Sequence, residues 1–115
     1  MNPEQLFGLL ADATRLRSLM LIHAEGEVCV CELTFALQES QPKISRHLAA
    51  MRDADLVVPR REGTWMHYRL NPDLPPWVLE VIAGTAARLG PLKPYSADRA
   101  RLETMNNRPG DVRCA

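Results

Sequence analysis

The chain has 115 residues, a formal net charge of zero at pH 7, 46% hydrophobic residues and 24% charged residues. These values are those of an ordinary globular protein, and the length suits one domain with a modest core. No apolar run approaches the roughly 18 residues of a membrane span, and the first residues lack the layout of a signal peptide. We therefore expect a cytoplasmic protein with no membrane partner. Its three cysteines should stay reduced, and their odd number disfavours a disulfide framework.

Apolar spacing predicts four helices in the first half of the chain. They cover residues 3–11, the stretch from Asp12 to near Gly26, residues 31–37 and residues 40–52. Ser40 is a suitable N-cap for the last of them, which carries a narrow apolar stripe on one face and polar or basic side chains on the other.

The apolar period then changes from 3.6 to two residues. Residues 56–61 and 64–70 are rich in β-branched and aromatic side chains and are joined through Glu62-Gly63, which predicts a β-hairpin. Residues 74–90 predict a fifth helix, whose apolar face is too large to serve its own small domain alone. The fold class that we expect is mainly α with a β-hairpin (α+β).

Residues 91–115 differ from the rest because they contain several prolines and few apolar side chains. We expect a weak helix over residues 97–105 and otherwise a flexible C-terminal tail. The predicted organisation is one folded unit over residues 1–90, followed by this tail over residues 91–115.

Charge is unevenly distributed along the chain. Residues 1–39 carry two basic and six acidic side chains, a net charge of −4, whereas residues 40–70 carry six basic and three acidic side chains, a net charge of +3. A basic segment within a neutral protein is typical of contacts with nucleic-acid phosphates.

The third and fourth helices with the short turn between them fit a helix-turn-helix, and the hairpin after them fits a wing. In such modules the second helix enters the major groove, where Gln41 and Arg46 could pair with adenine and guanine edges respectively. Residues 40–52 taken alone could instead be a solvated basic face, and the hairpin that follows favours DNA binding. The other candidate DNA contacts are polar or basic side chains of this helix and the hairpin: Ser40, Lys43, Ser45, His47, Arg60, Arg61 and Arg69.

Cys29 and Cys31 lie two residues apart where the third helix should begin. A lone cysteine is often just a small buried apolar residue. The open amide groups at a helix N-terminus favour the thiolate, however, which is the form that binds soft ions. Residues i and i+2 of a regular helix point about 200° apart, so two sulfurs could share one small ion only if the first turn unwound. Cys114 in the tail is a candidate third ligand. No constellation of residues indicates an enzyme.

Residues 27–33, 40–48 and 61–68 together resemble the ArsR/SmtB metalloregulators, and within that family the arsenical-resistance repressors. The resemblance covers about residues 3–90. It implies a winged helix-turn-helix homodimer that represses transcription from double-stranded operator DNA with an inverted repeat. It also implies release when trivalent arsenic or antimony, as inducer, binds thiolates, with no cofactor in the DNA-bound form. The first and fifth helices usually form the dimer interface in this family.

The sequence departs from part of this family at Thr34, where some arsenic sensors carry a third cysteine. A hydroxyl is a poor ligand for a soft centre. Either Cys114 completes a three-sulfur site, or the site has two protein thiols and an exogenous third ligand, which would suit monomethylated trivalent arsenic. Zinc sensing through the fifth helix is not expected, because residues 74–90 contain no histidine and Glu80 is their only acid.

Two other functions remain open from the sequence. In the first, oxidation of Cys29 and Cys31 releases DNA, although the neighbouring Glu27 and Glu32 oppose thiolate formation. In the second, the chain is a small thiol enzyme or zinc-binding module without a DNA role, although it lacks a positioned base and a fourth obvious zinc ligand. Operator binding by the reduced protein, measured with arsenite and then with peroxide, separates the three functions.

Overall fold

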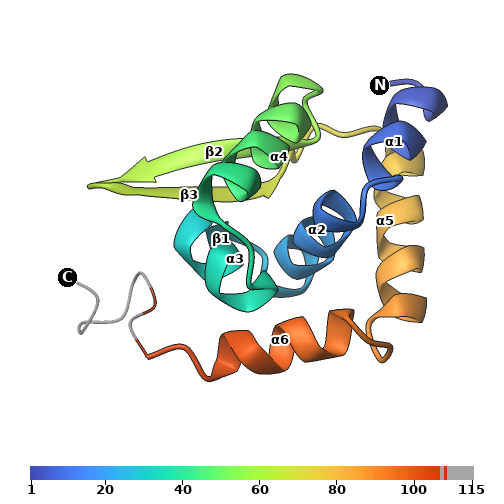
Figure 1. The fold of residues 1–115 in the computed structure, drawn as a ribbon. Coiled ribbons are helices and arrows are strands. Elements are labelled where there is room, and N and C mark those ends of the chain that lie inside the picture. Colours follow the sequence, from blue (N-terminus) through green and yellow to red (C-terminus); the bar gives the residue numbers. More distant parts are fainter. Residues whose placement is uncertain (107, 109–115) are drawn as a thin grey trace.

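A computed structural model describes residues 1–106 and 108 of the chain (Figure 1). In chain order the elements are α1 (Pro3–Leu10), α2 (Ala13–Glu25), β1 (Val28–Cys29), α3 (Val30–Leu37), α4 (Gln41–Asp53), β2 (Val57–Glu62), β3 (Trp65–Leu70), α5 (Pro76–Leu89) and α6 (Tyr95–Glu103). The β2–β3 hairpin projects from a helical body in which α2 is central, with α4 on one side and α6 on the opposite side. The predicted winged helix-turn-helix fold is confirmed. No helix among the described residues is long and apolar enough to cross a membrane.

The first, second and fourth helices begin where a polar side chain accepts a hydrogen bond from the backbone of the first turn. Asn2 Oδ1 accepts from the Gln5 amide at 2.8 Å, and Asp12 Oδ1 accepts from the Arg15 amide at 3.0 Å. The predicted N-cap Ser40 accepts from the amide of Lys43 at 3.4 Å. Such a cap contributes about 1 kcal/mol to helix stability, which explains why these boundaries could be located from the sequence.

The sheet has three antiparallel strands in the order β1–β3–β2. Gly63, with φ of +61°, lies in the tight turn of the hairpin, in a backbone region that glycine occupies at little cost. The two-residue strand β1 was not expected, because a strand this short has no measurable period. It pairs Val28 with Tyr68 and Cys29 with His67, so the cysteine segment forms the edge of the hairpin sheet.

The core is built from buried apolar side chains of all six helices and of the three strands. The apolar stripe of α4 is fully buried, as predicted, at Ile44, Leu48 and Met51. Burial of each such side chain contributes roughly 1.5–3 kcal/mol relative to exposure, so α4 is held firmly on its inner face. Its outer face remains available for a partner.

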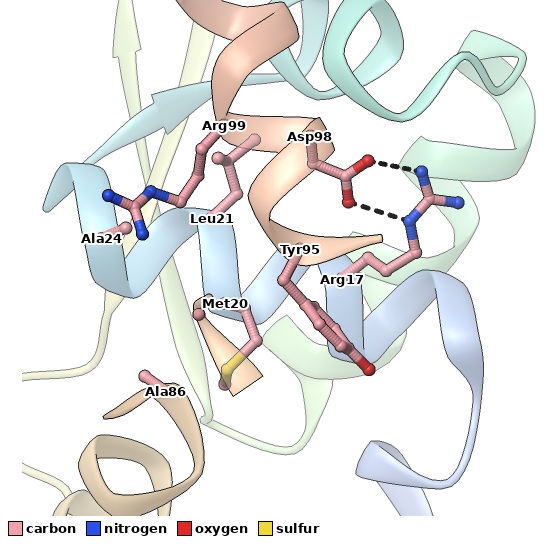
Figure 2. A pocket seen from close by; sticks show the side chains of 9 residues that line it. Arg17, Met20, Leu21, Ala24, Ala86, Tyr95, Asp98 and Arg99 are labelled. Carbon is pink, nitrogen blue, oxygen red and sulfur yellow. Dashed lines mark hydrogen bonds and ion pairs between the residues drawn. The ribbon is translucent and has the colours of Figure 1, made fainter. Parts of the chain in front are cut away.

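Helix α6 confirms the helix expected within the C-terminal segment, beginning two residues earlier than predicted, and it is packed against α2 and α3. Leu102 is 1% exposed in the core. Asp98, also buried, accepts hydrogen bonds from Arg17 Nε at 2.9 Å and from Nη2 at 2.6 Å, which Figure 2 shows spanning α2 and α6. Arg101 Nη1 donates to the carbonyl of Ala36. Residues 95–103 are thus a packed part of the folded body rather than a weak helix within a flexible tail.

Candidate functional site

Cys29 and Cys31 sit at the junction of β1 and α3. Cys29 is the N-cap of α3, with φ of −90° and ψ of 156°, and its Sγ accepts a hydrogen bond from the Cys31 amide at 3.2 Å. Both residues are thiols; Cys29 is buried and Cys31 is partly exposed. Because Cys29 is extended rather than helical, the expected 200° divergence of two helical side chains does not apply. The first turn of α3 therefore does not have to unwind for this reason before the two sulfurs can share one ion.

Glu32 connects the cysteine segment to the end of the described chain. Its Oε1 accepts a hydrogen bond from the Cys29 amide at 2.8 Å, which completes a capping box for α3. Its Oε2 accepts from Arg108 Nε at 2.6 Å, and Arg108 Nη2 reaches Glu25 Oε1 at 2.8 Å. The C-terminal segment is therefore held against the cysteine segment six residues before Cys114, which itself lies outside the described residues.

A groove of about 690 Å³ opens beside the two cysteines. Its walls come from α3, from Gln41 and Ser45 of α4, from residues 64–66 of the hairpin and from Met105 after α6. The groove therefore joins the thiols to both of the elements that the sequence assigns to DNA binding. No group of three or more His, Cys, Asp or Glu side chains is placed to hold a metal ion within residues 1–106 and 108.

The predicted DNA-reading side chains of α4 differ in how they are placed. Gln41 and Arg46 are exposed, and Ser45 is partly exposed in the groove. Lys43 Nζ lies 3.1 Å from Oε2 of Glu39, a partly exposed residue in the turn that precedes α4. Such an exposed pair contributes little to stability and leaves the lysine able to turn toward a phosphate.

His47 faces α2 rather than the exposed side of α4. Its side chain is 12% exposed, its Nδ1 lies 3.3 Å from Arg15 Nη1, and its Nε2 lies 3.8 Å from Asp12 Oδ1. Burial is the main cause of a lowered pKa at His47, and the positive charges of Arg15, Arg46 and Lys43 act in the same direction. The structure therefore separates His47 from the other predicted DNA contacts of this helix.

The arginines of the hairpin also divide into two kinds. Arg61 and Arg69 are exposed. Arg60 is exposed too, but it donates to Glu27 Oε1 at 2.6 Å and Oε2 at 3.1 Å, and to Glu62 Oε2 at 2.9 Å. The hydrogen bonds from Arg60 lower the pKa of Glu27. Arg60 therefore ties the hairpin to the segment that leads into Cys29, a link that no local sequence pattern could indicate.

Comparisons with known protein families and with individual relatives point to the same family. Residues 12–58 match the pattern of the arsR family of bacterial regulatory proteins. Arsenic resistance transcriptional regulator ArsR1 of Pseudomonas putida is 49% identical over 117 residues, covering 100% of this chain and 89% of the relative. The arsenical resistance operon repressor of Escherichia coli K12 is 52% identical over 80 residues, covering 70% of this chain and 68% of the relative.

Two solved structures have the same fold as this chain. The AntR antimony-specific transcriptional repressor superposes with a TM-score of 0.62 at 29% identity and covers 75% of both chains. Reduced HlyU from Vibrio cholerae superposes with a TM-score of 0.62 at 28% identity, covering 78% of this chain and 86% of the other. These likenesses agree with the motifs at residues 27–33, 40–48 and 61–68. The chain belongs to the arsR family of bacterial regulatory proteins, a family of DNA-binding transcriptional regulators rather than enzymes.

Proposed function

We propose that this chain is a dimeric repressor that releases an inverted-repeat operator when trivalent arsenic or antimony binds Cys29 and Cys31. One observation carries the proposal: both thiols line the same groove as Gln41 and Ser45 of α4 and as residues 64–66 of the hairpin. A ligand on the sulfurs therefore contacts or displaces the walls of the DNA-binding surface. The names of the arsenical-resistance and antimony-specific relatives supply the class of inducer.

The N-cap role of Cys29 gives the ligand a way to act on the helix. Its sulfur accepts the hydrogen bond that closes the first turn of α3, and that helix packs against α4. A bond from this sulfur to arsenic withdraws electron density from the accepting lone pairs, which weakens the cap and loosens α3. By linkage, DNA must weaken metalloid binding by the same factor by which metalloid weakens DNA binding. A coupling of about 3 kcal/mol would give roughly 150-fold release.

In the operator complex, we assign base contacts to Gln41 and Arg46 at the exposed N-terminal part of α4. Ser40, Lys43 and Ser45 suit phosphate or base contacts, and Arg61 and Arg69 suit phosphates beside the hairpin. Arg60 can contact a DNA phosphate only if it first gives up its ion pair with Glu27 or Glu62. His47 holds α4 to α2 in this scheme and touches no base.

The dimer is proposed from an apolar surface on α1 and α5. Phe7 is 54% exposed and Leu79 is 38% exposed, on helices that Figure 1 shows at the edge remote from the hairpin tip. Two copies joined there would present two α4 helices about one DNA turn apart, as an inverted repeat requires. We expect wild type to sediment as a dimer, and Leu79→Glu as a monomer with much weaker operator binding. A monomeric wild type that binds the operator fully would contradict this arrangement.

A third sulfur ligand for inorganic arsenite is proposed from Cys114. It follows Arg108 by six residues, a reach of up to about 20 Å in extended chain. Arg108 is itself fixed to Glu32 beside the cysteines. We expect X-ray absorption to count three sulfurs per arsenic in wild type and two in Cys114→Ser. The arsenite response should weaken modestly in that variant, while the methylarsenite response should stay nearly intact. Two sulfurs in wild type would remove Cys114 from the site.

The deciding experiment measures operator binding by the reduced protein, first with arsenite and then with peroxide. We expect arsenite to release the DNA and Cys29→Ser or Cys31→Ser to prevent that release. The rival function is a thiol redox switch. The paired thiols and the structural likeness to reduced HlyU support it, but less strongly than the arsenical-resistance relatives support a metalloid response. Release by peroxide without any effect of arsenite would establish the redox switch instead.

A further inference from the structure

The groove beside Cys29 and Cys31 is larger and more apolar than one arsenic atom requires. Its volume is about 690 Å³, and Phe35, Trp65, Met66 and Met105 all contribute to its walls. We propose that this groove receives the organic substituent of a trivalent organoarsenical, an aryl group above all, whose arsenic is held by the two thiolates. The inference rests on the proposed function, because it names the class of inducer that the same thiols bind.

The chemistry of such a ligand fits a two-thiol site. An arsonous acid, R–As(OH)₂, reacts with two thiols to form two As–S bonds while two As–O bonds break. Each thiol proton leaves with a hydroxide as water, and arsenic remains trivalent throughout. The third valence is filled by the carbon of R, so no third protein ligand is needed.

The groove walls favour an apolar substituent over an ion or a phosphate. Trp65 and Met66 open strand β3, Met105 follows α6, and the Phe35 side chain is 41% exposed on α3. Aromatic rings pack well against one another in offset or edge-to-face arrangements, and a thioether sulfur is attracted to a ring. An aryl group would bury apolar area here that arsenite cannot bury. The side chains of Phe35, Met66 and Met105 have no hydrogen-bond donor for a DNA phosphate, so DNA binding alone does not account for them.

The position of the groove links the size of the substituent to DNA release. Gln41 and Ser45 form the α4 wall, while the hairpin forms another. A group bound between them contacts the helix assigned to base reading and the wing together. A ligand shifts a conformational equilibrium only by its differential contacts with the two states. An aryl substituent adds contacts with the groove walls to those that arsenic makes through the sulfurs, so it should release the operator at a lower concentration than arsenite does.

The two tryptophans of the chain provide a direct test, since Trp65 lines the groove and Trp77 does not. The Trp77→Phe variant of the reduced full-length protein leaves Trp65 as the single reporter, and Trp65→Phe is the matched control with Trp77 alone. Both are titrated with phenylarsonous acid and with arsenite. We expect phenylarsonous acid to change Trp65 emission and to saturate at one equivalent per chain. The emission of Trp77 should not change.

Affinity separates a groove contact from simple thiol capture. Trp65→Ala should raise the ratio of the phenylarsonous acid to the arsenite dissociation constant about tenfold, as expected for loss of an aromatic contact. Trp65→Leu, which keeps an apolar side chain, should raise the ratio less and serves as a second variant if Trp65→Ala folds poorly. Circular dichroism and urea denaturation check the fold of each variant.

The outcomes distinguish the two proposals. If arsenite releases the operator but phenylarsonous acid leaves the emission of Trp65 unchanged, the groove inference is wrong and the proposed function stands. The same holds if both Trp65 variants leave the ratio of dissociation constants unchanged. If neither arsenical binds Cys29 and Cys31 in wild type, the proposed function fails and the groove inference fails with it.

Discussion

Arginine side chains are used differently on the two sides of this molecule. On the side formed by α2, α3 and α6, two arginines end on buried protein groups: Arg17 on the Asp98 carboxylate and Arg101 on the Ala36 carbonyl. On the side formed by α4 and the hairpin, Arg46, Arg61 and Arg69 are exposed. Burial in an ion pair makes an arginine part of the frame, whereas an exposed arginine keeps its donors available for phosphate or guanine. The first side holds the second in position.

The cysteines lie between these two sides, and Arg60 shows how the sides are joined. This hairpin arginine is exposed, yet it is paired with Glu27 in the segment that leads to Cys29. On the other flank, Glu32 links Cys29 to Arg108. A change at the sulfurs can therefore reach the hairpin through β1 and Glu27, and α4 through α3.

The largest effect is expected at the cysteines themselves. Cys29→Ser or Cys31→Ser should keep operator binding and lose essentially all of the roughly 150-fold release by arsenite, because oxygen is a poor ligand for a soft centre. Fluorescence anisotropy of a labelled operator, with and without arsenite, measures both quantities. Loss of DNA binding in both reduced variants would instead mean that the cysteines are structural parts of the frame.

The next largest effect tests the frame side. Asp98→Ala leaves Arg17 without its buried carboxylate and should lower the free energy of unfolding by about 3 kcal/mol or more. Asp53→Ala is the matched control, because Asp53 pairs with Arg52 on the surface and should cost about 1 kcal/mol at most. Urea denaturation compares the two. Equal losses would show that the ion pair between α2 and α6 is not what fastens α6.

The sequence allowed prediction of those features that depend on local residue spacing and on helix caps. The helices, the hairpin and the cysteine pair at the start of α3 all depend on residues close together in the chain. Helix α6 depends instead on pairs such as Arg17 and Asp98, which are 81 residues apart, and so its packing left no local trace. The groove could not be predicted either, since Trp65 and Met105 reach the cysteines from separate elements.

A third prediction concerns the exposed side. Arg46→Ala should cost about 1–3 kcal/mol in operator binding and relax specificity at one base pair if Arg46 pairs with guanine. Arg61→Ala is the comparison, because a phosphate contact should weaken all sequences alike and reduce the salt slope by about one. Binding to a set of operators with single base changes, at several salt concentrations, separates the two roles. The reverse pattern would mean that the base contact and the phosphate contact have been assigned to the wrong arginines.

A smaller effect is expected where the two sides meet. Glu27→Gln removes the charge that holds Arg60, so operator affinity should rise by roughly twofold to fivefold as the arginine turns to phosphate. Glu62→Gln is the matched control, since Glu62 holds the same arginine from within the hairpin. Both variants should strengthen DNA binding, but only Glu27→Gln should also reduce the release by arsenite. An unchanged release in Glu27→Gln would exclude this path between the sulfurs and the hairpin.

The smallest effect concerns His47, which lies between the frame and α4. Burial lowers its pKa, Asp12 partly opposes this, and Arg15, Lys43 and Arg46 reinforce it. The unfolded chain, with a histidine pKa of about 6.5, then binds the proton more readily than the folded chain. The stability from neutral His47 is therefore complete above about pH 6.5 and is lost as pH falls through the lowered folded pKa. Urea denaturation from pH 7.5 to pH 5 should show a smaller fall in unfolding free energy for His47→Gln than for wild type. An equal fall in both proteins would mean that other groups cause it and that His47 is not the titrating link between α2 and α4.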